Sequence, residues 1–229
     1  NTQQSLMRNL SLFPIAGISV RRMAEWLHLR NLNDVDELIE MGFVTPAAGH
    51  MIRLHPMMQE IAIVDLKPSV KKCKILLTNL QEICLAHGVD APYFKLLFQT
   101  VENIIAYIEK DEPTFFLRFL EDVFPYMEKY QYRLGMERVL FALETAVPNY
   151  GSNEDRALLL DYRATMEKND QKAIKYEKDA LALIPEINAS NALLVSNLHS
   201  NPGGLYANIK QYALASEHME TGLRILEEY

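Results

Sequence analysis

The arrangement of this chain is decided by one short stretch, Leu54-His55-Pro56-Met57-Met58-Gln59-Glu60-Ile61-Ala62. Residues 51–54, Met-Ile-Arg-Leu, which end at the first residue of this stretch, are predicted to form a short β-strand. Pro56 then stands where a helix favours proline, at its first position. We therefore predict that a strand ends at Leu54 and a helix begins at Pro56. The pattern before this point is short helices and a hairpin, and the pattern after it is helical to Tyr229.

Three short helices are predicted before the strand, each marked by its end signals. The first covers residues 5–12 and is stopped by Pro14. The second is capped by Ser19 and the third by Asn33, because Ser and Asn side chains accept hydrogen bonds from the first turn of a helix. Gly42 stands where the third helix would end, at the position that favours glycine.

Two β stretches, 43–45 and 51–54, follow the third helix. The proline and glycine of Pro46-Ala47-Ala48-Gly49 between them suit a type I turn. Three helices followed by a hairpin make a winged helix-turn-helix, which we assign to residues 1–66.

From Pro68 onward apolar residues recur at helical spacing, with breaks at His87-Gly88-Val89 and Asp111-Glu112-Pro113. Further helices are expected near 114–130, 133–147, 154–168, 172–184, 190–210 and 212–228. Aromatic side chains are dense between residues 115 and 132, and we expect them to be mostly core packing. They are Phe115, Phe116, Phe119, Phe124, Tyr126, Tyr130 and Tyr132.

Small and turn residues recur as they do in tetratricopeptide repeats. The pattern is clearest in Ala164, Asp170, Ala173, Ala180 and Pro185. The seven-residue spacing of Ala173 and Ala180 recurs in Gly135 and Ala142 and in Ala215 and Gly222. We therefore predict a mainly α fold: a winged helix at 1–66, connecting helices at 67–112, and an α-α superhelix of tetratricopeptide-like repeats at 113–229.

Three residues near the C-terminus depart from a regular repeat. Pro202 would remove a helical hydrogen bond, so residues 200–204 are expected to be either a loop or a kinked helix. Leu223 and Leu226 are expected to face a partner outside this sequence, because repeat arrays normally end in a polar cap.

Composition and motifs exclude several function classes. The chain has 229 residues and a net charge of −7, which disfavours general binding to nucleic acid or to membrane surfaces. No apolar run is long enough to span a bilayer, so we expect a cytoplasmic protein. The first residue is Asn1, which suggests a piece of a longer chain. Cys73 and Cys84 are expected to be reduced and buried.

The motifs of common catalytic and metal sites are missing from the sequence. It lacks a Gly-x-x-x-x-Gly-Lys-Ser/Thr phosphate loop and a Gly-x-Ser-x-Gly elbow, so no catalytic residue and no enzyme activity are assigned to this chain. The six histidines show no His-Glu-x-x-His spacing, and no metal ligand is predicted.

The Leu54-His55-Pro56 motif, placed between a winged helix and helical repeats, resembles signal-transduction ATPases of the STAND/NB-ARC type. Their winged helix ends in a Met-His-Asp or Leu-His-Pro motif. The resemblance implies that His55 contacts the β-phosphate of ADP in the intact parent protein, where ADP or ATP is the cofactor; this chain alone is expected to hold none. It also implies two partners: the nucleotide-binding core of the same parent chain, and a protein or peptide ligand sensed by the repeats.

Three other interpretations remain open. His55 could be structural, as the residue that caps the helix through Pro56. The chain could be a transcription regulator whose winged helix binds DNA, although the third helix carries Asp34, Asp36, Glu37 and Glu40, which would repel phosphates. It could also be a plain protein-protein scaffold. A basic edge for DNA could be formed by Arg21, Arg22, Arg30 and Arg53, which are otherwise surface residues. Lys67, Lys71, Lys72 and Lys74 form a basic patch, either a solvated helix face or an electrostatic contact with an acidic neighbouring domain.

Overall fold

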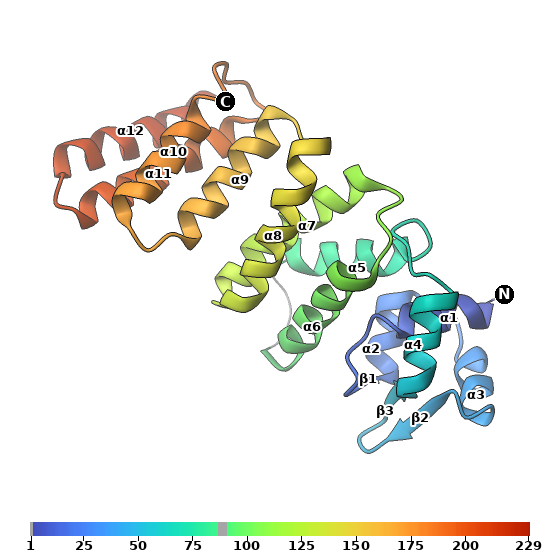
Figure 1. The fold of residues 1–229 in the computed structure, drawn as a ribbon. Coiled ribbons are helices and arrows are strands. Elements are labelled where there is room, and N and C mark those ends of the chain that lie inside the picture. Colours follow the sequence, from blue (N-terminus) through green and yellow to red (C-terminus); the bar gives the residue numbers. More distant parts are fainter. Residues whose placement is uncertain (1, 87–90) are drawn as a thin grey trace. The chain divides into compact units, whose positions relative to one another are not determined.

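A computed structural model describes residues 2–86 and 91–229 of the chain (Figure 1). Twelve helices and three short strands are present among these residues, so the protein is mainly α, as predicted. Its internal contacts divide it into two compact units, Asn1–Val139 and Leu140–Tyr229. The expected boundaries near residues 66 and 112 both fall inside the first unit, and the three-part division stays a prediction.

The first unit begins with helices and strands in the order expected for a winged helix. Its elements are α1 (Thr2–Leu10), β1 (Ile18–Ser19), α2 (Val20–Leu27), α3 (Asn33–Glu40), β2 (Val44–Ala47), β3 (Met51–Leu54), α4 (Pro56–Asp65), α5 (Lys74–Leu85), α6 (Ala91–Tyr107), α7 (Pro113–Lys129) and the start of α8 (Arg133–Tyr150). The predicted change from strand to helix at Leu54 and Pro56 is confirmed.

The three strands form an antiparallel sheet in the order β1-β3-β2. Strand β1 was not predicted, because two residues are too short to show an alternating pattern. Gly17, just before it, has φ +91°, and a Cβ atom there would lie 2.4 Å from the carbonyl oxygen of Ile52 on β3. Only glycine allows this approach of the two backbones.

The predicted type I turn over residues 46–49 is wrong. Pro46 and Ala47 belong to β2 and pair with Ile52 and Met51 of β3. The connecting loop is 48–50, with Gly49 at φ +75° and His50 at φ +57°. Proline fits in β2 because this strand lies at the edge of the sheet, where a missing N–H group is tolerated.

The helix caps follow the sequence signals at two of three positions. The Ser19 hydroxyl accepts a hydrogen bond from the Arg22 N–H at 3.3 Å, so its cap is confirmed. Gly42 has φ +75° after the end of α3, as predicted for a C-terminal glycine. The cap at Asn33 is wrong: Asn33 is the first residue of α3, and its N–H donates to the Asn31 side chain at 3.1 Å. An asparagine turn two residues earlier therefore does the capping.

Side-chain hydrogen bonds join the first four helices to the later helices of the first unit. Asn79 on α5 donates to the carbonyl of Trp26 at 2.7 Å, and this bond is buried. Asn103 on α6 donates to the carbonyl of Leu12 at 3.2 Å. Because buried amides require such partners, these bonds hold α5 and α6 against the α1–α2 region.

The expected helical pattern from Pro68 begins later than predicted. Residues 68–73 form a turn joined to Glu109 by backbone bonds: Val70 N–H to Glu109 O at 3.0 Å, and Glu109 N–H to Pro68 O at 2.8 Å. Helix α5 starts at Lys74. The break at Asp111-Glu112 is confirmed by the gap between α6 and α7. The break predicted at His87-Gly88-Val89 lies outside the described residues.

The aromatic residues of α7 and the segment after it are core, as predicted. Phe116, Phe119, Phe124 and Tyr126 are buried, and the other three are half-buried. Tyr132 stacks on Phe98 of α6 with ring centroids 4.9 Å apart. Stacked and edge-on rings of this kind add to the stabilisation from buried area.

The second unit contains the end of α8 and four further helices: α9 (Asn153–Met166), α10 (Asp170–Leu181), α11 (Ala192–Asn208) and α12 (Tyr212–Glu228). The first of these starts with a capping box between Ser152 and Asp155. The second unit contains a core cluster of small and branched apolar side chains: Ala157, Ala180, Ile184, Ala192, Val195, Leu198 and Ile225.

The small residues of the repeat pattern lie where helices approach closely. Ala173 and Ala180 are fully buried, and a Cβ atom on Gly222 would lie 3.0 Å from the Ser196 carbonyl oxygen. Pro202 does not end its helix, because α11 continues to Asn208. None of the described helices combines the length and hydrophobicity that a membrane span requires.

Candidate functional site at the start of helix α4

His55 lies between β3 and α4, where the sequence placed it. Its backbone is held on both sides: the N–H donates to the Phe43 carbonyl at 3.0 Å, and the carbonyl accepts from the Gln59 N–H at 2.9 Å. Pro56 occupies the first position of α4. The backbone of His55 is therefore fixed by the hairpin and by the helix together.

The imidazole of His55 has a different environment from its backbone. The side chain is exposed and makes no capping hydrogen bond to α4. The first N–H groups of a helix lack partners within the helix, and an imidazole can also donate a hydrogen bond, so two kinds of donor adjoin in the sequence at the start of α4. The capping interpretation therefore applies to the backbone of His55, and the ring has no part in it.

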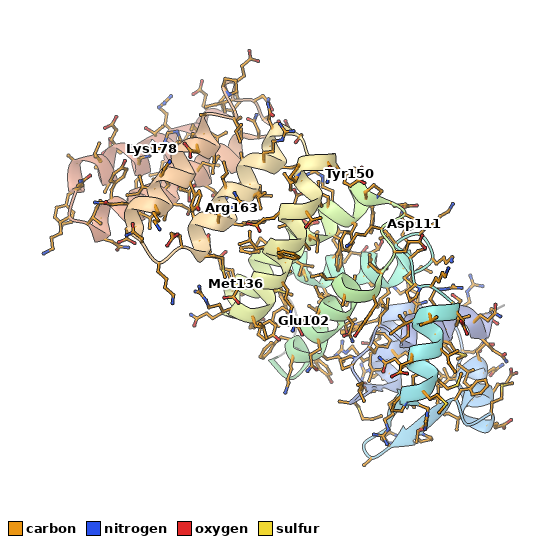
Figure 2. The ribbon with its side chains drawn as sticks, in the orientation of Figure 1. Glu102, Asp111, Met136, Tyr150, Arg163 and Lys178 are labelled. Carbon is orange, nitrogen blue, oxygen red and sulfur yellow. The ribbon has the colours of Figure 1, made fainter. Side chains whose placement is uncertain are left out.

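Gln59, one turn into α4, fixes the helix on the segment after α1. Its side-chain amide donates to the Ser11 carbonyl at 2.9 Å and to the Phe13 carbonyl at 3.0 Å. A cavity of about 470 Å³ lies beside this anchor and is lined by Pro56, Gln59 and Glu60 of α4 and by residues of α6. One α6 residue lining it, Glu102, is labelled in Figure 2.

One face of α4 exposes large apolar side chains. Met57 is 63% exposed, Ile61 39% and Val64 65%, at a spacing of four and then three residues. This spacing places them on one face of a helix. Ala62, on another face of the same helix, is fully buried. We call Met57, Ile61 and Val64 the α4 stripe.

Helix α3 exposes carboxylate side chains, as its sequence predicted. Asp36, Glu37 and Glu40 on α3 are exposed. The Thr2 hydroxyl of α1 donates to Asp34 at 3.0 Å, and the Gln3 amide donates to Glu37. A helix with exposed carboxylates would repel the phosphates of a DNA groove.

Three of the eight basic residues named above form ion pairs within the chain. Arg21 and Arg22 both form ion pairs with Glu25, at 3.1 and 3.0 Å. Lys74 pairs with Glu112 at 2.6 Å. Surface pairs of this kind contribute little stability, but they neutralise local charge.

The two cysteines are free and buried, as predicted. Burial raises the pKa of Cys73 to about 11 and that of Cys84 to about 12. Such thiols are unreactive, because the thiolate is the nucleophile. No cluster of three or more His, Cys, Asp or Glu side chains that could hold a metal ion occurs in the described part of the chain.

The last helix exposes a second apolar surface. Leu223 is 62% exposed and Leu226 49%, as expected for side chains that face something outside this sequence. Tyr212 and Met219 are also exposed, at 66% and 43%. Their spacing places them on the same face of α12 as the two leucines.

Two polar clusters of the second unit were not predicted. Asp161 and Glu177 are buried together, and His199 lies beside His218. Sequence reasoning missed them because their members lie 16 and 19 residues apart on different helices. Glu177 did carry a signal, since it stands between Ala173 and Ala180 on the apolar face of its helix.

No protein-family model and no curated protein matches this chain. Among solved structures, it is similar to a Signal Transduction ATPase with Numerous Domains (STAND) protein with a tetratricopeptide repeat sensor from Pyrococcus horikoshii. The two share 12% sequence identity with a TM-score of 0.47, and the likeness covers all of this chain and 45% of that protein. The chain thus spans less than half the length of the STAND protein that it resembles.

Proposed function

We propose that this chain is the regulatory and protein-binding region of a signal-transduction NTPase. Its winged helix and α4 would pack on a nucleotide-binding core that lies outside this sequence. Its helical repeats would bind a protein or peptide ligand. We assign no catalytic step to the chain itself, which lacks a phosphate loop.

The observation that carries the proposal is the surface at the start of α4. An exposed imidazole, free of any capping role, stands next to the first turn of the helix, and the α4 stripe continues along the same helix. Exposed apolar side chains in a continuous stripe are typical of an interaction surface. An imidazole and helix N–H groups together are suited to a phosphate.

In the intact protein, His55 would donate a hydrogen bond to a phosphate of bound ADP and so stabilise the closed state. The α4 stripe would be covered by the core in that state. A ligand on the repeats opens such a protein only if it binds the open state more tightly than the closed state. The exposed face of α12 around Leu223 is one surface to which a ligand could bind more tightly in the open state than in the closed state.

The alternative of a DNA-binding regulator is disfavoured by the exposed carboxylates of α3. A plain scaffold remains the second candidate. It accounts for the exposed stripes, but it gives the imidazole of His55 no role.

The first test is the coding sequence upstream of Asn1. A Gly-x-x-x-x-Gly-Lys-Ser/Thr motif is expected within roughly 250 residues, one or two domains away. Its absence from the whole gene would overturn the proposal.

The second test is made in the protein that carries both regions. His55→Ala should lose ADP that is retained through purification, measured by chromatography of the denatured protein, and should raise basal ATP hydrolysis. His50→Asn is the matched control, an exposed histidine in the adjoining loop, because asparagine tolerates the positive φ of that position. Equal ADP in the two variants would favour the scaffold.

A further inference from the structure

Two histidines face each other between the last two helices of the second unit. His199 on α11 and His218 on α12 place their Nδ1 atoms 3.3 Å apart, and both rings are half-buried. The backbones can approach here because Gly203 and Gly222 replace larger side chains: a Cβ atom on Gly203 would lie 2.8 Å from Met219 Cγ. The pair is therefore fixed by two packed helices and stays within reach of solvent.

The surroundings hold both rings in place and keep them neutral. Tyr206 packs against His218 with ring centroids 5.3 Å apart, and Lys178, labelled in Figure 2, lies 5.7 Å from the Tyr206 ring. Burial lowers the pKa of both histidines. His218 and then Arg224 lower the pKa of His199 further, whereas Glu217 raises and Lys178 lowers the pKa of His218. Neutral imidazoles have a lone pair to donate.

The spacing of the two nitrogens fits two arrangements. The first is a long N–H···N hydrogen bond, in which one Nδ1 carries the proton and the other accepts it. The second is a shared metal ion, because two imidazole nitrogens bound to one tetrahedral Zn²⁺ at about 2.0–2.1 Å are held roughly 3.3–3.4 Å apart. The observed separation of 3.3 Å is the one that the second arrangement requires.

We propose that His199 and His218 form a two-ligand site for a transition-metal dication, Zn²⁺ or another imidazole-preferring ion such as Cu²⁺ or Ni²⁺, whose other positions are taken by water. Both ligands would bind through Nδ1. A site with two protein ligands binds more weakly than a structural site with four, and Lys178 and Arg224 weaken it further. Metal bound here would clamp α11 to α12.

The test uses the whole chain without a histidine tag. Zn²⁺ is titrated by calorimetry, and Cu²⁺ is followed by electron paramagnetic resonance, in which ring nitrogens split the signal. We expect one saturable Zn²⁺ site, a rise in melting temperature with Zn²⁺, and coupling of Cu²⁺ to two ring nitrogens. His199→Asn and His218→Asn should each weaken Zn²⁺ binding by at least about tenfold. His50→Asn should leave it unchanged.

Three results would overturn the proposal. They are the absence of a saturable site in the unsubstituted chain at millimolar Zn²⁺, a Zn²⁺ affinity in the His199 and His218 variants equal to that of the unsubstituted chain, and coupling of Cu²⁺ to fewer than two ring nitrogens. Circular dichroism shows whether each variant folds. If either does not, the resonance spectrum of the unsubstituted chain decides the question.

Discussion

The carboxyl groups of Asp161 and Glu177 interact with each other in the interior of the second unit. Asn201 of α11 donates to Asp161 at 2.7 Å, and Glu177 is 1% exposed. Burial and the neighbouring Asp161 raise the pKa of Glu177 to about 9. Glu177 therefore keeps its proton at neutral pH.

This pair predicts that the second unit loses stability as pH rises. The pKa of Glu177 is about 9 in the folded chain and 4.5 in the unfolded chain. Its contribution to the free energy of unfolding is therefore largest below pH 4.5 and is lost progressively as pH rises to about 9. Glu177→Gln keeps a donor for Asp161 and cannot ionise. We expect this variant to be more stable than the unsubstituted chain by at least about 1 kcal/mol at pH 8 and nearly equal at pH 5. Calorimetric melts at the two pH values measure the difference.

The control for this prediction is Glu227→Gln, at an exposed position of α12. It should leave the melting temperature nearly unchanged at both pH values. A Glu177→Gln variant that is less stable at pH 8 would show that the carboxyl pair is not protonated.

Gly17 is predicted to be more sensitive to alanine than Gly42. Both have positive φ, so alanine is strained at either position by about 1–2 kcal/mol. A Cβ atom at Gly42 meets nothing within 4 Å, whereas at Gly17 it meets the Ile52 carbonyl. Gly17→Ala should therefore cost roughly 1–3 kcal/mol more than Gly42→Ala. Urea unfolding followed by the fluorescence of Trp26, the single tryptophan, reports on the first unit. Equal costs would mean that β1 does not pair with β3 as described.

Val64, at the end of the α4 stripe, is predicted to contribute little to the stability of the isolated chain. Val64→Glu should change the free energy of unfolding by less than about 0.5 kcal/mol, because Val64 is 65% exposed. Ala62→Glu, two residues earlier, should cost at least about 3 kcal/mol, since it buries an unpaired charge. The same urea experiment compares them. If Val64→Glu destabilises the chain as strongly as Ala62→Glu does, Val64 belongs to the hydrophobic interior. The α4 stripe would then not be a surface on which a nucleotide-binding domain could pack.

The thiols are predicted to be unreactive in the folded chain at pH 8. With pKa values of about 11 and 12, the thiolate fraction is about one in a thousand or less. Aromatic disulfide reagents should label neither cysteine within the time in which they label both in urea. Rapid labelling of the native chain would show that α5 opens readily.

The sequence by itself determined the features that depend on local signals. Periodic apolar spacing located the helices, and the change from strand to helix at His55 and Pro56 was read from a proline at a helix start. Ser19 and Gly42 were assigned correctly, because capping depends on one side chain and its adjacent backbone. Alanines at seven-residue spacing marked where α10 packs.

Tertiary structure decided what depends on residues far apart in the chain. Strand β1 exists only because β3 pairs with it, and Pro46 is a strand residue only because β2 lies at an edge. The partners Asp161 and Glu177, and His199 and His218, come from different helices, and no short-range pattern links them. Exposure of the imidazole at His55 and of the α4 stripe was likewise set by which face of α4 the other helices cover. Burial and pairing are properties of the packed chain, so charge state and candidate ligand sites appear only once the helices are in contact.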